Sequence, residues 1–253
     1  MNTYVKSWLK PAFFCAAVLL SWVAQANIEI RYEAAETEQD KVSLVQIKRH
    51  QIPQQVVALV DDTLEIDADI VLLFGGEDGP LFDPQKTLIQ IPYAFISEVV
   101  DRFKIPELEM TEEEVQQALD GALAHTLLHE IGHALVFANE LPVLGKEEDA
   151  VDSFATLWLL EGFDDGQQMA LDAALLFALE DQDIPEFEEQ DFWDEHSLDI
   201  QRYYQTLCLV YGSDPERMQL ETELYDQEFI EERSEICVEE FEILSTNWQT
   251  LTQ

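Results

Sequence analysis

The chain has 253 residues, 53 of them acidic and 13 basic, so its formal net charge at pH 7 is −40. Such an excess of negative charge repels nucleic acid phosphates and anionic membrane surfaces, which argues against proteins that bind either of them. The acidic residues are spread along every segment, and we interpret them as a solvated surface coat. A preference for cationic substrates or a salty habitat would also account for the excess.

The start of the chain predicts export. Two lysines precede an apolar run from Ala12 to Val23, and Ala24-Gln25-Ala26 supplies the small residues that a signal peptidase recognises. The apolar run is shorter than the ~20 residues that span a bilayer, although an uncleaved N-terminal anchor is the alternative. We therefore predict a signal peptide at residues 1–26 and a mature chain, residues 27–253, that is periplasmic or secreted and free of the membrane.

The first part of the mature chain predicts a small sheet with one or two helices. Apolar alternation and short apolar runs indicate strands over residues 28–32, 70–74 and 87–91. Valines at helical spacing follow Pro53, whereas residues 38–50 are compatible with a strand or a helix.

From Thr111 onward the pattern is helical almost to the end of the chain. A capping box of Thr111 and Glu114 predicts a long helix that reaches about Asn139. Further helices are predicted over residues 147–160, 167–180, 197–211 and 228–248. The expected architecture is a single α+β domain, in which a mixed lobe (27–110) precedes a helical lobe (111–253).

Two cysteines remain in the mature chain, Cys208 and Cys237. An even number of cysteines in an exported protein favours a disulfide bond between them. Two separately buried thiols are the alternative.

The long helix contains the sequence His129-Glu130-Ile131-Gly132-His133. Histidines at positions i and i+4 project from one face of a helix and can bind the same metal ion. Glu130 lies beside that face, where its carboxylate can take a proton from a water molecule next to the metal. This combination predicts a zinc (Zn²⁺) site with Glu130 as the general base; a chance match on a buried helix is the alternative.

The third ligand is predicted at the start of the next helix. Glu148 and Asp152 are also i and i+4 neighbours, and the intervening loop is long enough to bring them back to His129 and His133. We expect Glu148 to bind the metal and Asp152 to accept a hydrogen bond from the free nitrogen of a ligand histidine. Glu147 is the rival ligand, and both acids could instead be solvated residues at a helix start.

The sequence HEIGH followed by Glu-x-x-x-Asp looks like the gluzincin pattern of zinc peptidases. The stretches LPVLGKEEDAVDSFA (141–155) and DEHSLDIQRYYQTLCLVYG (194–212) resemble a bacterial family of inferred metallopeptidases that was first catalogued as a domain of unknown function. The resemblance covers most of the mature chain. It implies bound zinc, a gluzincin-like, zincin-type fold and an exported or envelope location, but it does not supply a substrate. We expect a peptide or protein substrate if the chain is an enzyme. By analogy with other zincins, the strand at 87–91 is expected to be the edge along which an extended peptide pairs.

Three other histidines need separate interpretation. Gluzincins commonly place a histidine, tyrosine or arginine across the cleft to stabilise an oxyanion, and His196 is the candidate, oriented by Asp194 or Asp199. A helix-capping or interface role is its alternative, and Arg202 or Tyr203 could take its place. His125 is expected to lie in the core or behind the ligands, and His50 on the surface without a partner nearby.

These residues together predict a zinc-dependent hydrolase, in which His129, His133 and Glu148 hold the metal and Glu130 and His196 take part in catalysis. A non-catalytic exported protein that keeps the zinc as a structural element and binds a cationic partner is the rival interpretation. Structural zinc sites have four protein ligands and are usually rich in cysteine. Both mature cysteines are far along the chain from HEIGH, which argues against that rival. A zinc hydrolase that acts on another bond is a third possibility.

Overall fold

The computed structural model describes residues 27–184, 186–218 and 227–252, and the predicted signal peptide and its cleavage site lie outside these ranges. The described chain forms a small sheet first and helices afterwards. The predicted α+β class is therefore confirmed. Within the same ranges, none of the helices combines the length and the apolar character that a membrane crossing requires.

The sheet has four strands, β1 (Asn27–Tyr32), β2 (Asp69–Phe74), β3 (Leu81–Asp83) and β4 (Leu88–Ile91), in the order β1-β2-β4-β3. Neighbouring strands are parallel except for β3, which runs antiparallel to β4. The three predicted strands are present. The expectation that strand 87–91 forms an edge was wrong, because the short β3, enclosed by two proline-containing turns, pairs with β4 and occupies the edge.

Helices α1 (Glu38–Arg49), α2 (Ile52–Thr63) and α3 (Tyr93–Phe103) accompany the sheet, followed by the short helix η1 (Pro106–Leu108). The ambiguous segment 38–50 becomes helical because Thr37 and Asp40 form a capping box at its start. Helix α3 was not predicted. Its buried residues Ile96, Val99, Val100 and Phe103 have helical spacing, but they directly follow a strand that ends at Pro92.

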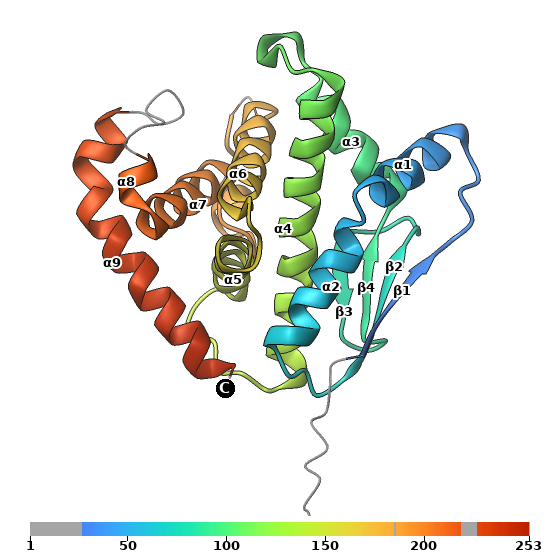
Figure 1. Ribbon diagram of the computed structural model, residues 1–253, viewed down its shortest axis with the longest axis horizontal. Coiled ribbons are helices and arrows are strands. Elements are labelled where there is room, and N and C mark those ends of the chain that lie inside the picture. The colour runs from blue at the N-terminus through green and yellow to red at the C-terminus, as the bar shows by residue number, and fades with distance from the viewer. Residues whose placement is uncertain (1–26, 185, 219–226, 253) are drawn as a thin grey trace, which may run out of the picture.

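Helix α4 (Glu112–Ala138) stands between the sheet with α1–α3 and the remaining helices (Figure 1). It begins at the predicted capping box of Thr111 and Glu114 and packs against α3, α5 and α6. The remaining helices are α5 (Glu147–Gly162), α6 (Gly166–Gln182), η2 (Glu189–Phe192), α7 (Asp199–Ser213), α8 (Pro215–Met218) and α9 (Gln227–Leu251). Because α4 is covered on both sides, its HEIGH sequence lies in the middle of the molecule.

The C-terminal helix is attached to the core by a covalent bond. Cys208 in α7 is bonded to Cys237 in α9, with 4.8 Å between their Cα atoms, so the predicted disulfide is present. Near the end of α9, the buried Trp248 donates a hydrogen bond from Nε1 to the hydroxyl of Ser153 on α5, over 3.2 Å. Helix α9 thus fixes α7 and α5 relative to each other.

Candidate metal centre

His129 and His133 project from the same face of α4, one turn apart, as their spacing predicts. Their Nε2 atoms lie 3.2 Å from each other, and both face the start of α5. Gly132 allows α5 to lie this close to α4, because a Cβ atom at its position would lie 3.0 Å from the side chain of Val151 on α5. The glycine of HEIGH therefore lets the second helix pack closely against the two histidines.

Glu148 completes a group of three converging donors. Its Oε2 lies 3.2 Å from Nε2 of His129 and 3.3 Å from Nε2 of His133. When zinc binds nitrogen and oxygen ligands at about 2.0–2.1 Å, the corners of the tetrahedron lie about 3.3–3.4 Å apart. The three donor atoms already have this spacing, and two imidazoles with one carboxylate are ligand types that zinc prefers. The residues therefore fit a zinc ion.

The other nitrogen of each histidine is held by a carboxylate. Nδ1 of His129 lies 2.7 Å from Oδ1 of Asp152, and Nδ1 of His133 lies 2.8 Å from Oε1 of Glu147. Arg202 on α7 donates to both oxygens of Asp152, over 2.7 and 3.0 Å. Each contact leaves Nε2 of the ring directed at the cluster, which is how ligand histidines are oriented in metal sites.

These contacts also change the proton affinities of the groups. Burial lowers the pKa of His129, but the hydrogen bonds with Asp152 and Glu148 outweigh it and raise that pKa to about 9. Burial raises the pKa of Glu148, whereas its hydrogen bonds with three histidines hold the pKa of this carboxyl far below its usual value. Burial likewise opposes ionisation of Asp152, and the charge of Arg202 and the contact with His129 keep its pKa low. These contacts therefore favour the charged forms of His129, Glu148 and Asp152.

Glu130 lies next to the cluster without joining it. Its side chain is buried and lines the same cleft as His129 and His133. Burial raises the pKa of Glu130, although the neighbouring His129 and His133 lower it. Its position beside the histidine pair is the one predicted for a proton acceptor.

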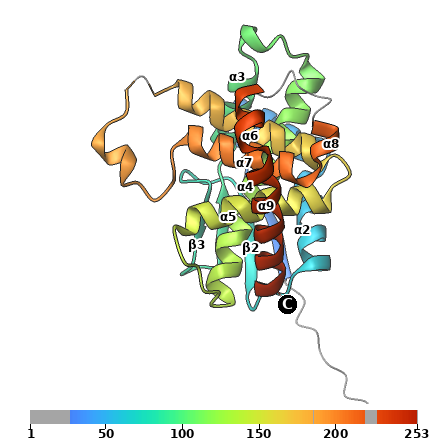
Figure 2. The same ribbon diagram turned by 90° about the vertical axis from the view of Figure 1, so that its left-hand side faces the viewer.

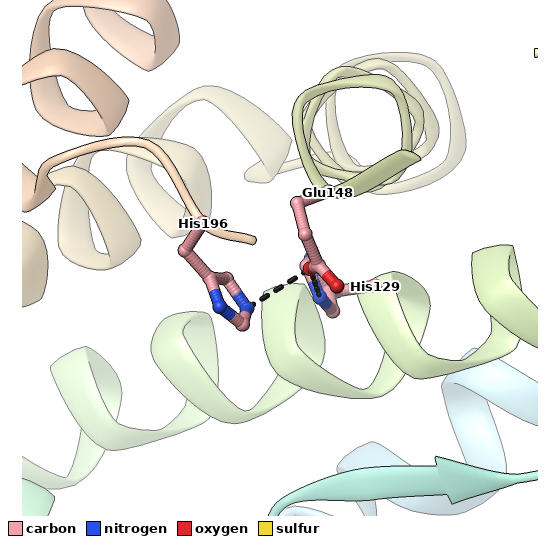
Figure 3. Close-up of side chains that lie close together, drawn as sticks. All are labelled: His129, Glu148 and His196. Carbon is pink, nitrogen blue, oxygen red and sulfur yellow. Dashed lines mark ion pairs between the residues drawn. The ribbon is translucent and has the colours of Figure 1, made fainter. Parts of the chain in front are cut away.

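His196 reaches the cluster from the segment that precedes α7. Its Nε2 lies 2.9 Å from Oε2 of Glu148, and the rings of His196 and His129 are nearly parallel at a centroid distance of 6.1 Å (Figure 3). Asp194 accepts a hydrogen bond from the backbone nitrogen of His196 and lies 3.7 Å from its Nδ1. Of the two predicted orienting acids, Asp194 is therefore the neighbour of His196, whereas Asp199 pairs with Arg202.

The cluster opens into a cleft of about 710 Å³. One wall is formed by Leu81 and Phe82 of the edge strand β3, and another by Phe137 at the end of α4. The segment with Asp194, Glu195 and His196 forms the opposite rim. The edge strand β3, the end of α4 and the segment with His196 thus border the cleft into which the cluster opens.

Comparison with known families gives a match over nearly the whole chain. A family described as "Putative metallopeptidase" matches residues 32–252. The chain belongs to this family. Neither the curated proteins nor the solved structures that were compared contain a match.

In this member of the metallopeptidase family, the structure brings together the residues predicted as ligands and the residues predicted beside them. It also brings Lys146 to the cleft, which the sequence did not predict, and gives Glu147 and Arg202 contacts other than those considered for them. Glu147 was considered only as a rival ligand, and instead it contacts the outer nitrogen of His133. Glu147 and Glu148 are neighbours at the start of the helix that the loop brings back beside the two histidines. The sequence could therefore have suggested that Glu147 contacts a ligand histidine.

The structure also shows the contacts of His125, His50 and Arg202. His125 is buried beside Thr156, as expected for a core residue, and burial lowers its pKa to about 3. The expectation that His50 lies on the surface without a partner was wrong, since its Nδ1 contacts Asp120 on α4. Arg202 is committed to Asp152 and does not line the cleft, which makes it unsuited as an oxyanion donor.

Proposed function

We propose that the protein is a zinc-dependent metallohydrolase that cleaves peptide bonds. The observation that carries the proposal is the convergence of His129, His133 and Glu148 at tetrahedral spacing, with Glu130 beside them in an open cleft. Two histidines and one glutamate are the protein ligands of a group of catalytic zinc sites, which leave a further position for water or substrate. The family assignment supports the same class of activity.

Each residue of the cluster has a separate task in the proposed reaction. When bound, zinc would polarise the substrate carbonyl and activate a water molecule. The Glu130 carboxylate accepts the proton of the attacking water and returns it to the leaving amine. Asp152 and Glu147 hold the ligand imidazoles in the tautomer that directs Nε2 at the metal. His196 is proposed to donate a hydrogen bond from Nε2 to the oxyanion.

The cleft suggests how a peptide substrate is held. Strand β3 pairs with β4 along one edge only in the described sheet, and its residues Leu81 and Phe82 line the cleft. An extended peptide could add to the other edge through backbone hydrogen bonds, which bind a chain without selecting its sequence. The predicted signal peptide and the disulfide between Cys208 and Cys237 support an exported protein, in the periplasm or outside the cell.

The rival is a non-catalytic binding protein with a structural zinc ion. One observation favours it, namely that Nε2 of His196 lies near enough to Glu148 to supply a fourth protein donor. Glu130 argues against it. A structural site has no use for a carboxylate buried next to the ligands and opening into a cleft.

Substitution of Glu130 separates the two functions. The Glu130→Gln protein should bind one zinc per chain like wild type, yet cleave a proteome-derived peptide library about 10²–10⁴ times more slowly. A chelator should abolish cleavage by wild type. The matched control is Glu112→Gln, an exposed position at the start of the same helix, which should cleave normally.

The remaining outcomes are equally informative. Equal cleavage by wild type and Glu130→Gln would exclude Glu130 as the base. Zinc-loaded protein that cleaves no peptide, with or without the substitution, would favour the binding protein. Loss of zinc on Glu147→Ala but not on Glu148→Ala would exclude the assignment of Glu148 as the third ligand.

A further inference from the structure

His196 lies on a different kind of segment from the other three members of the cluster, which are His129, His133 and Glu148. His129 and Glu148 lie on the packed helices α4 and α5, whereas His196 belongs to residues 186–198, which stand out from the helices between α6 and α7 (Figure 2). Its side chain is 47% exposed, compared with 7% for His129 and 15% for Glu148. His196 can therefore move without disturbing the hydrophobic core.

In the structure, however, His196 is directed at the cluster. Its Nε2 lies 2.9 Å from the same oxygen, Oε2 of Glu148, on which His129 and His133 converge. The donor atoms of His129, Glu148 and His196 all lie within 4.8 Å of one another. Figure 3 shows the ring of His196 pointing at Glu148, with His129 behind it. An imidazole nitrogen in this position is within reach of an ion held by the other residues.

Contacts from the start of α5 hold His196 there. The Lys146 ammonium donates to the backbone carbonyls of Asp194 and His196, each over 3.0 Å. The Ser197 hydroxyl donates to the Asp149 carboxylate over 2.6 Å. Lys146 and Asp149 flank Glu148 on both sides along the chain. One helix end therefore carries a metal ligand and also fastens the segment that carries His196.

We propose that His196 is a fourth and exchangeable metal ligand, which closes the site in the resting protein and is displaced when a substrate carbonyl or water takes its position. Lys146 is the positioning residue that keeps it in place. Once displaced, the ring remains at the rim of the cleft, where it can donate to the oxyanion. The inference rests on the proposed zinc site, but not on the peptidase activity.

Cobalt substitution gives a readout that is independent of activity. Tetrahedral cobalt(II) absorbs visible light much more strongly than five- or six-coordinate cobalt(II). Wild type should therefore show an intense band. His196→Ala should show a weaker one, because loss of the imidazole opens the site to more than one water and raises the coordination number. Zinc affinity, measured by competition with a chromophoric chelator, should fall by at least about tenfold in His196→Ala. Trp193→Ala, an exposed neutral change in the same segment, is the matched control and should change neither quantity.

Exchange of the ligand is tested with acetohydroxamate, a small molecule that binds zinc directly. In wild type it must displace His196, and a closed site lowers the apparent affinity of any such competitor. Acetohydroxamate should therefore bind His196→Ala several-fold more tightly than wild type. Lys146→Ala should change the cobalt band in the same direction as His196→Ala. Lys146→Arg should keep the wild-type band, because a guanidinium can also donate to both carbonyls. This pair gives a second test if His196→Ala folds poorly.

The possible failures are distinguishable. An unchanged cobalt band and zinc affinity in His196→Ala would overturn the fourth-ligand assignment and leave His196 with the oxyanion role alone. Failure of acetohydroxamate to bind wild type or to change its cobalt band, while it binds His196→Ala, would overturn exchange and make His196 a permanent ligand. Equal or weaker binding by His196→Ala would show that His196 does not close the position that the competitor takes. If wild type binds no zinc, the proposed function fails first. If it binds zinc and Glu130→Gln abolishes cleavage, the proposed function stands whatever His196 does.

Discussion

At the scale of single residues, Asp152 connects the proposed metal site to the helical core. It contacts His129 on α4 with one oxygen, and both of its oxygens accept hydrogen bonds from Arg202 on α7. Arg202 in turn lies over the ring of Phe177 on α6, 4.0 Å from its centroid. The orientation of one ligand therefore depends on a buried ion pair between residues that are 50 positions apart in the chain. Removing either charge would leave its partner buried and unpaired, which is costly.

We predict that Asp152→Asn weakens zinc binding by about 10–100-fold, the usual effect of changing a residue that orients a ligand histidine. The amide keeps the volume but offers a single acceptor oxygen for His129 and Arg202 together. Chelator competition on protein with a native circular dichroism spectrum measures the effect. Glu161→Gln, exposed on the same helix, is the control and should bind zinc like wild type. Unchanged zinc affinity with reduced stability would show that Asp152 serves Arg202 and not the metal.

The residues of the proposed metal site could be predicted from the sequence to the extent that their geometry is local. His129 and His133, or Glu148 and Asp152, are four residues apart on one helix, so the helical period alone places each pair on one face. Lys146 is different. Its contact with the carbonyls of Asp194 and His196 depends on the path of a segment 48 to 50 residues later. No periodicity in the sequence carries that information.

At the scale of helices and strands, the contact between α7 and α9 is fixed by a covalent bond. Helix α9 packs mainly on α7 and to a lesser extent on α5. The two helices approach closely at Gly212, where a Cβ atom would lie 2.3 Å from the backbone oxygen of Cys237. The bridge from Cys208 to Cys237 thus lies where the helices touch. We infer that it limits separation of the C-terminal helix from the core.

We predict that the double variant Cys208→Ala/Cys237→Ala loses about 3.5 kcal/mol of the free energy of unfolding, since the bridge closes a loop of about 30 residues in the unfolded chain. Denaturant unfolding under oxidising conditions measures this loss. Wild type in the presence of a reductant should lose a similar amount. The folded variant should keep its zinc affinity, because the bridge contacts none of the proposed ligands. Equal stability of reduced and oxidised wild type would contradict the prediction.

The elements that the sequence predicted well are those with several turns or several alternations. Helix α4 was recognised from its capping box and its length, and β2 from an apolar run closed by glycines. Strand β3 has three residues between two turns, too few for a pattern, and its omission led to the wrong edge of the sheet. Helix α3 was missed because it follows β4 with Pro92 alone between them. Edge position and short connections are set by tertiary packing, which single-sequence patterns do not contain.

At the scale of the whole molecule, the balance of charges opposes folding. There are about four acidic residues for each basic one, so the basic residues are too few to give each carboxylate a cationic partner. The ion pairs that do form include exposed ones such as Lys41 with Glu38 and Lys86 with Asp83. Exposed pairs contribute only about 0–1 kcal/mol each and cannot offset the general repulsion. Within the proposed metal site, His129, Glu130 and Asp152 are buried, so their interactions respond little to salt.

Salt should therefore stabilise this protein, although it weakens ion pairs. Between 0.01 M and 0.1 M ionic strength the screening length falls from about 30 Å to about 10 Å, which removes repulsion between distant carboxylates before it affects contacts at about 3 Å. We predict that the melting temperature rises by several degrees between about 0.01 M and about 0.5 M sodium chloride, with most of the gain below about 0.2 M. A gain of about 2 kcal/mol corresponds to roughly 4–8 °C for a chain of this size.

Sucrose at the same osmolality distinguishes screening from a general effect of cosolutes, because a neutral solute is excluded from the surface but screens no charge. It should give a smaller increase without the early plateau. The metal-bound protein should show the same dependence as the chelated one, since the cluster contributes little to the exposed charge. A melting temperature that falls as salt is added would mean that the few ion pairs outweigh the repulsion. The acidic surface would then be stabilised by specific contacts, and the interpretation of the acids as a solvated coat would have to be abandoned.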